Sequence, residues 1–187
     1  MTSPAKPILV VVSGPPGSGK TTLAHRLARA IGCPAICRDE IKEGMARQHP
    51  DFTPARDDDL SRATNPVFFT VLATLLRAGV TTVAEAAFQD RLWRPGLEPL
   101  RPLARIRIVH CTVDPELALS RSLRRSAQDA ENRHRRAHPD PGPADAGHYL
   151  ARLRAFERIA LAAPSMEVDT TDGYQPTLAD LVAFLAP

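Results

Sequence analysis

A glycine-rich segment near the N-terminus, Gly14-Pro-Pro-Gly-Ser-Gly-Lys-Thr21, fits the pattern G-x-x-x-x-G-K-[ST] in full. Such glycines let backbone N–H groups turn toward one point, where an anion can bind. We expect Lys20 to reach the β- and γ-phosphates of a nucleoside triphosphate and the Thr21 hydroxyl to coordinate Mg²⁺. The predicted nucleotide contacts lie in the loop and the turn after it: Gly14, Pro15, Gly17, Ser18, Gly19, Lys20, Thr21 and Thr22. The alternative is a glycine-rich turn with a chance lysine.

The segments on either side of this loop have the character that phosphate binding needs. Residues 7–13 form a continuous apolar, β-branched run, which is typical of a strand buried on both faces. After the loop, Leu23, Leu27 and Ile31 recur every four residues and Gly32 follows, which predicts a helix with a glycine stop. A strand, a loop and a helix in this order place the helix N-terminus at the phosphates.

A second candidate element, Arg38-Asp-Glu-Ile-Lys42, follows the short predicted strand Ala35–Cys37. A carboxylate at Asp39 that faces the γ-phosphate can accept the proton of a hydroxyl nucleophile during in-line attack. The same residue would also suit the N-cap of a helix from Glu40 to Arg47. The two roles are compatible.

The loop together with the R-D-E-I-K element resembles the P-loop small kinases. This family includes polynucleotide 5′-kinase domains, chloramphenicol phosphotransferase and zeta-type toxins. The resemblance implies that Asp39 acts on the acceptor hydroxyl as a general base or orienting group and helps to hold the metal. It also implies that Lys42 contacts the acceptor, although a solvated helix lysine is an alternative interpretation.

An acid often follows the third strand in related kinases, and Glu85 stands there, after the predicted strand that ends at Val83-Ala84. Its side chain is one methylene longer than the usual Asp, so it could serve either the acceptor or a water molecule on Mg²⁺. The fourth predicted strand ends Val109-His110-Cys111 with no Asp, so the acid of a conventional Walker B motif is absent there. The metal's carboxylate would then come from Asp39 or Glu85.

Two arginines four residues apart, Arg121 and Arg125, project from one face of a predicted helix. They resemble the paired arginines at the lid hinge of nucleoside-monophosphate and polynucleotide kinases, where one lies over the adenine and the other binds the transferring phosphoryl group. Residues 126–146 lack large apolar side chains and predict a mobile, arginine-rich lid in which Arg133 would reach the substrate. The alternative is a solvated basic face. Thr170 follows the last predicted strand, where relatives pack the adenine ring.

Strands and helices alternate along the chain, which predicts an α/β fold with right-handed crossovers. Further strands are expected at residues 79–84, 105–111 and 166–169, and a last helix carries Leu178, Leu181, Val182 and Leu185. We expect one P-loop NTPase domain over residues 1–187, with three layers: a parallel sheet of about five strands and helices on both faces.

The overall composition excludes a membrane protein and a disulfide scaffold. The 187 residues carry 24 basic and 21 acidic side chains, and arginines outnumber lysines by 21 to three, which base composition could explain. No secretory signal is apparent, so Cys33, Cys37 and Cys111 are interpreted as free thiols in a reducing cytoplasm. A zinc site joining Cys33 and Cys37 to His134 and His138 has the wrong spacing for a compact finger.

The sequence therefore predicts a cytoplasmic, ATP- and Mg²⁺-dependent phosphotransferase that acts on a hydroxyl group. We expect a small-molecule acceptor, such as an antibiotic, nucleoside or sugar derivative, because nine aromatic residues and the acidic run Asp57–Asp59 do not suit a nucleic acid. A polynucleotide 5′-hydroxyl kinase is the alternative within this class. A nucleotide-binding switch or regulatory ATPase without an acceptor is the alternative from another class.

Overall fold

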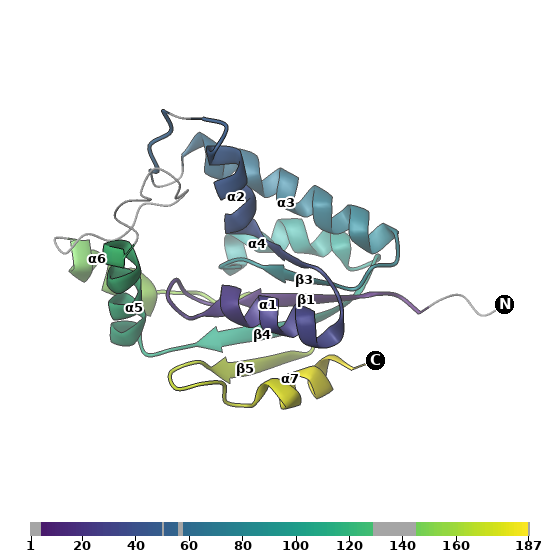
Figure 1. The fold of residues 1–187 in the computed structure, drawn as a ribbon. Coiled ribbons are helices and arrows are strands. Elements are labelled where there is room, and N and C mark those ends of the chain that lie inside the picture. Colours follow the sequence, from purple (N-terminus) through teal and green to yellow (C-terminus); the bar gives the residue numbers. More distant parts are fainter. Residues whose placement is uncertain (1–4, 50, 56–57, 129–144, 187) are drawn as a thin grey trace.

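The centre of the structure is one parallel sheet. The computed structural model describes residues 5–49, 51–55, 58–128 and 145–186. Its strands are β1 (Ile8–Ser13), β2 (Ala35–Cys37), β3 (Thr82–Glu85), β4 (Arg105–Thr112) and β5 (Ser165–Asp169). They form one five-stranded sheet in the order β2-β3-β1-β4-β5, and every neighbouring pair runs parallel. The predicted sheet is confirmed, and all of its carboxyl ends meet at one edge (Figure 1).

Helices cover both faces of this sheet, as predicted (Figure 1). They are α1 (Lys20–Ile31), α2 (Arg38–Ala46), α3 (Asp59–Arg77), α4 (Asp90–Leu97), the 3₁₀ turn η1 (Glu98–Leu100), α5 (Pro115–Gln128), α6 (Ala146–Arg154) and α7 (Leu178–Leu185). Helices α1 and α7 lie on one face, whereas α3 and α4 lie on the other. Helices α5 and α6 pack together beyond the carboxyl edge.

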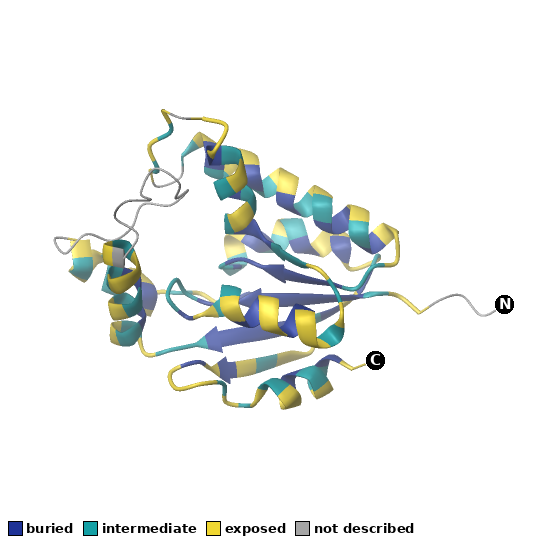
Figure 2. Ribbon diagram, in the orientation of Figure 1, coloured by how far each residue is buried: buried dark blue, intermediate teal, exposed yellow. Residues whose placement is uncertain are grey.

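The side chains of β1 divide between two hydrophobic clusters, because successive residues of a strand point to opposite faces. Val10 and Val12 join the cluster under α1 and α7, whereas Leu9 and Val11 join the one under α3 and α4. All six residues of β1 are buried (Figure 2). A strand buried on both faces explains the continuous apolar run in the sequence.

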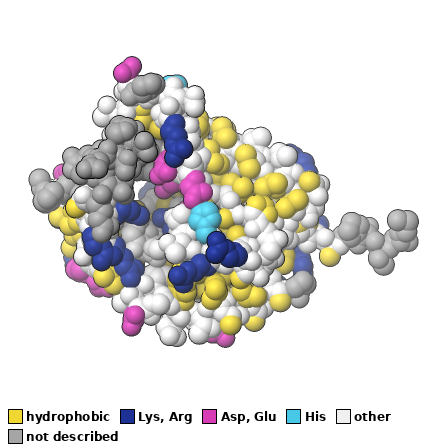
Figure 3. Space-filling model, viewed as in Figure 1, with side chains coloured by type: hydrophobic (Ala, Val, Ile, Leu, Met, Phe, Trp, Pro, Cys, Tyr) yellow, Lys and Arg dark blue, Asp and Glu magenta, His cyan; other side chains and the backbone are white. Residues whose placement is uncertain are grey.

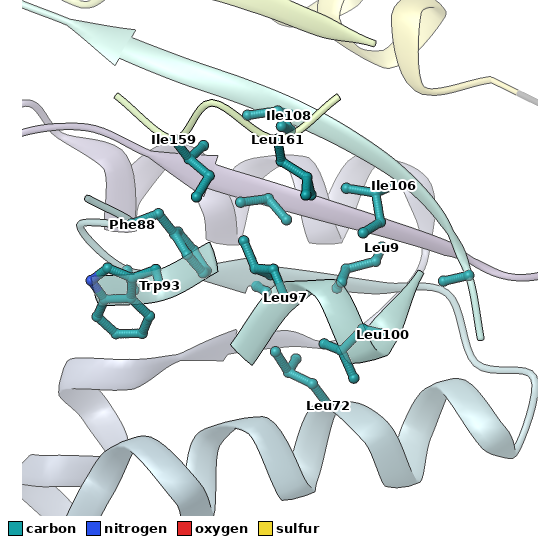
Figure 4. Packing of buried hydrophobic residues seen from close by; sticks show 14 of the residues in the cluster. Leu9, Leu72, Phe88, Trp93, Leu97, Leu100, Ile106, Ile108, Ile159 and Leu161 are labelled. Atoms are coloured by element: carbon teal, nitrogen blue, oxygen red, sulfur yellow. The ribbon is translucent and has the colours of Figure 1, made fainter. Parts of the chain in front are cut away.

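An aromatic group anchors the chain just after β3 (Figure 4). Phe88 has a φ of 42°, a backbone conformation that costs a residue with a side chain about 1–2 kcal/mol. Its fully buried ring lies 5.0 Å from the Trp93 ring and 6.1 Å from the Phe68 ring, centroid to centroid. Burial of a phenylalanine contributes about 1.5–3 kcal/mol, which offsets this strain. The Ser13 hydroxyl donates to the Ala87 carbonyl at 3.0 Å, so the turn is tied to the end of β1.

The helix boundaries correct one expectation. Helix α2 begins at Arg38 with Cys37 as its N-cap residue, so Asp39 lies within the first turn and is not an N-cap. Helices α4 and α6 were not predicted. Pro95 lies inside α4, and a proline within an apolar pattern indicates a break when only the sequence is read.

Most of the predicted lid, including Arg133, lies outside the described residues, as do His134 and His138. The structure therefore does not test these predictions. No helix in the described part of the chain combines the length and the apolar character needed to cross a bilayer.

Candidate nucleotide and acceptor site

The glycine-rich loop leaves the end of β1 and leads into α1. Gly17 has a φ of +79°, and a Cβ atom there would lie 2.4 Å from the carbonyl oxygen of Ala118 in α5. Only glycine fits this close approach. Gly19 has a φ of +73° and is the N-cap residue of α1. The loop is thus pressed against α5 while the first N–H groups of α1 remain available to an anion.

The loop is also held from the end of β5. The hydroxyl of Thr170 is buried and lies 2.8 Å from the Ser18 carbonyl oxygen and 3.0 Å from that of Thr112. One hydroxyl proton is therefore shared between the loop and β4. Thr170 was predicted as a nucleotide contact, and in the structure its side chain is hydrogen-bonded to the backbone of the loop at Ser18. Its backbone carbonyl, in turn, accepts a hydrogen bond from Arg121.

Arg121 and Arg125 lie one turn apart on α5, as predicted. The Arg121 guanidinium donates to the carbonyl oxygens of Thr170 and Thr171, each at 2.9 Å. These bonds hold Arg121 beside the segment after β5, which is the region that the resemblance associates with the adenine. The Arg125 residue is exposed.

Glu85 is the most unusual group at this edge, because its carboxylate is buried at 1% exposure. Within the described part of the chain, neither oxygen accepts a hydrogen bond. The Lys20 ammonium lies 3.6 Å from Oε1. Burial raises the pKa of Glu85; the Lys20 charge opposes this rise, the Asp39 charge adds to it, and the Thr21 hydroxyl opposes it. A buried carboxylate with spare lone pairs, beside a hydroxyl and an ammonium, fits a hydrated Mg²⁺ ion, which prefers oxygen ligands.

The sheet order explains why this acid stands on β3. Strands β3 and β4 both flank β1, and Glu85 pairs in register with Val12, close to the start of the loop. The end of β4 carries no acid, because its last residues are His110, Cys111 and Thr112. Across β1, Val12 pairs with Glu85 on the β3 side and with Val109 on the β4 side, so the acid at this level comes from β3.

Asp39 projects from the first turn of α2 and its side chain is 45% exposed. The Arg38 guanidinium lies 3.2 Å from Oδ1 of Asp39 and also donates to the Asn65 side-chain oxygen and the Ser61 carbonyl, at 3.1 and 2.9 Å. Arg38 itself is buried. Arg38 therefore links the Asp39 carboxylate to α3.

Arg38 was not singled out by sequence reasoning, although a signal was available. A cation in the first turn of a helix is unfavourable for the helix dipole, so its presence points to specific partners nearby. Those partners come from α3, which is distant in the sequence.

Lys42 was expected to contact the acceptor, with a solvated helix lysine as the alternative. Its side chain is completely buried, and its ammonium lies 2.9 Å from Oδ2 of Asp58, the N-cap residue of α3. The alternative of a solvated lysine is therefore wrong. Direct contact with an acceptor would require this ion pair to break, so in the structure Lys42 ties α2 to α3. Burial raises the pKa of Asp58, but Lys42 and the N–H groups of Ser61 and Ala55 outweigh it and lower the value to about 2.

The fold thus brings Lys20, Thr21, Glu85 and Asp39 to one part of the carboxyl edge, and it holds Arg121 at the β5 side of the loop. On the face drawn in Figure 3, a group of acidic side chains lies near Lys, Arg and His side chains. This part of the structure therefore contains cations that can bind phosphates. It also contains carboxylates that can bind a metal or accept a hydroxyl proton.

Comparisons with known proteins point in one direction. A family model described as an AAA domain (AAA_33) matches residues 9–140. A presumed kinase from Chloroflexus aurantiacus superposes with a TM-score of 0.82 at 25% identity, covering 96% of both chains. A gluconokinase from Sinorhizobium meliloti superposes with a TM-score of 0.62 at 19% identity, covering 97% of this chain and 93% of that one.

A shorter match concerns the shikimate kinase of Corynebacterium efficiens. It is 51% identical over 39 residues, which is 21% of this chain and 22% of that protein. The likeness to this curated relative thus spans less than a quarter of its length.

Proposed function

Since the chain belongs to the AAA_33 family of P-loop kinase domains, we propose that it is an ATP-dependent phosphotransferase acting on a hydroxyl group of a small molecule. One observation carries the proposal: the loop residues Lys20 and Thr21 face a buried carboxylate, Glu85, whose oxygens accept no hydrogen bond within the described part of the chain. The second carboxylate, Asp39, stands at the same edge on a different helix.

Backbone N–H groups of residues 17–21 and the Lys20 ammonium would hold the phosphates of ATP. Thr21 and Glu85, with Asp39 as the third candidate, are the residues that would hold Mg²⁺. When bound, Mg²⁺ would neutralise charge on the β- and γ-phosphates. In the structure the Lys20 ammonium lies 3.6 Å from the Glu85 carboxylate, so ATP binding would draw it away from Glu85 and toward the phosphates.

Asp39 would orient the acceptor hydroxyl and take its proton as the hydroxyl oxygen attacks the γ-phosphorus in line. The bond between the γ-phosphorus and the β–γ bridging oxygen breaks, and ADP leaves. Arg38, itself held by hydrogen bonds to Asn65 and Ser61 of α3, donates to the Asp39 carboxylate and keeps it in position. Arg125, and Arg133 from the lid, are proposed to stabilise charge on the transferring group, with Arg121 at the adenine side.

Two features favour a small acceptor. At the start of α3, Asp58 pairs with Lys42, and the 96% exposed Asp59 pairs with Arg62. These acids offset cations that could otherwise bind the phosphates of a nucleic-acid strand. The gluconokinase and the shikimate kinase are named for small molecules, which agrees with this choice.

The test is transfer of label from γ-labelled ATP to a panel of sugars, sugar acids, nucleosides and hydroxylated antibiotics, with a 5′-hydroxyl oligonucleotide included. The Lys20→Ala variant is the blank. We expect Asp39→Asn to lose at least about 100-fold in transfer while it still binds ATP. Asp59→Asn, an exposed acid on α3, is the matched control and should keep its activity.

The alternatives correspond to distinct outcomes. Label that appears only as free phosphate with every acceptor indicates a regulatory ATPase and ends the kinase proposal. Label on the oligonucleotide alone indicates a polynucleotide 5′-kinase. Loss of ATP binding in Asp39→Asn would contradict the acceptor role of that carboxylate.

A further inference from the structure

A second group of potential ligands lies beside the phosphate site but is not used by the proposed reaction. His25 on α1, Cys37 at the end of β2 and Glu40 on α2 each offer one ligand atom, and these atoms all lie within 4.8 Å of one another. The three residues come from three different elements. Cys37 and Glu40 are neighbours at the start of α2, and the fold brings His25 of α1 to them.

The distances within the group match a metal site. Nε2 of His25 lies 3.6 Å from Sγ of Cys37 and 2.6 Å from Oε1 of Glu40. In a tetrahedral zinc site, bonds of about 2.3 Å to sulfur and 2.0–2.1 Å to nitrogen set the two ligand atoms about 3.6 Å apart. The nitrogen and carboxylate oxygen would need to separate to about 3.3 Å. Both side chains are about half exposed, at 50% and 49%, so they have room to do so.

The choice of donor atoms distinguishes this group from the magnesium ligands. Thiolate and imidazole favour zinc and similar transition metals, whereas Mg²⁺ prefers the hydroxyl and carboxylate oxygens found at Thr21 and Glu85. The Cys37 residue is 2% exposed and its sulfur faces His25, so the thiol is reached from the side of the imidazole. Figure 3 shows a histidine directly against acidic side chains on the face where α1 stands in Figure 1.

We propose that His25, Cys37 and Glu40 form a binding site for a divalent transition metal of the zinc type, with a fourth position open to water. Binding displaces the thiol proton to solvent and involves no change of oxidation state. The metal would link α1, which carries the phosphate loop at its start, to α2, which carries Asp39. The bound ion would thus fix the phosphate loop relative to Asp39. The proposal does not depend on the identity of the acceptor or on phosphate transfer.

The test uses the full, untagged chain after removal of metal, in excess Mg²⁺ so that oxygen-ligand sites are filled. Co²⁺ is titrated in and the absorption spectrum is recorded, because a cobalt ion bound to thiolate gives a sulfur-to-cobalt charge-transfer band. We expect one equivalent of Co²⁺ to produce this band and Zn²⁺ to abolish it by displacement. Zn²⁺ should also raise the Tm by about 5 °C at saturation.

Single substitutions assign the ligands. Cys37→Ser should lose the charge-transfer band, and His25→Ala and Glu40→Gln should each weaken Co²⁺ binding at least about tenfold. The matched control is Cys33→Ser, which removes a partly buried thiol outside the group and should leave the band unchanged. If Cys37→Ser fails to fold, the two exposed positions still decide the matter. A wild-type chain without the band, or a band that survives in His25→Ala and Glu40→Gln at unchanged affinity, overturns the proposal.

Discussion

Replacing Asp58 by Asn leaves the ammonium of Lys42 buried without its counter-charge. The Lys42 side chain is fully buried and that of Asp58 is 9% exposed, with 2.9 Å between nitrogen and oxygen. The pKa of Asp58 falls from 3.8 to about 2 in the folded state. This shift corresponds to about 2 kcal/mol of stability at neutral pH. Because one partner of a buried pair is removed, we expect a total loss of about 3 kcal/mol.

The pH dependence gives a second measure of the same pair. A carboxyl group whose pKa is lowered by folding stabilises the protein above its unfolded pKa and loses that contribution as the pH falls through its folded pKa. The contribution of Asp58 should therefore be complete above about pH 4 and disappear toward pH 2. The difference between wild type and Asp58→Asn should shrink over the same interval.

Urea unfolding of both proteins at several pH values measures the two quantities. Asp59→Asn, an exposed acid next in the chain, is the control and should change stability by less than about 0.5 kcal/mol. Lys42→Met combined with Asp58→Asn should recover part of the loss, because the stranded charge is gone. A loss below about 1 kcal/mol at pH 7, or a difference that does not vary between pH 5 and 2, would refute the reasoning.

Three further substitutions test the site. Gly17→Ala places a Cβ 2.4 Å from the Ala118 carbonyl oxygen at a φ of +79°. We expect nucleotide affinity to fall sharply and the free energy of unfolding to fall by at least about 2 kcal/mol. Unchanged binding of a fluorescent nucleotide would contradict this. Thr170→Val removes the donor to the Ser18 carbonyl and should cost about 1–2 kcal/mol in urea unfolding, with Thr170→Ser as the rescuing control. Glu85→Gln removes a buried charge, so the Tm of the variant should match or exceed the wild-type value. Label transfer should fall at least about 100-fold. A lower Tm with normal transfer would argue against Glu85 as a metal ligand.

The sequence carried the local features of this protein. The glycine-rich loop was predicted at its place between a strand and a helix, because glycine conformation and helix initiation depend on neighbouring residues. The parallel sheet was predicted for a similar reason: apolar runs alternate with helical patterns, and that alternation admits few topologies. Strand Ala35–Cys37 was predicted with the bounds that the structure has.

Tertiary structure decided which distant groups meet. Glu85 became the acid beside the loop because β3, and not only β4, is a neighbour of β1, and strand order is not encoded in any local pattern. The burial of Lys42 and the connection of Arg38 to α3 depend on how α2 packs against α3. A charged residue on an amphipathic helix has the same local pattern whether it faces water or a partner. The partner exists only once the chain has folded, and for that reason the loop could be predicted from the sequence whereas its surroundings could not.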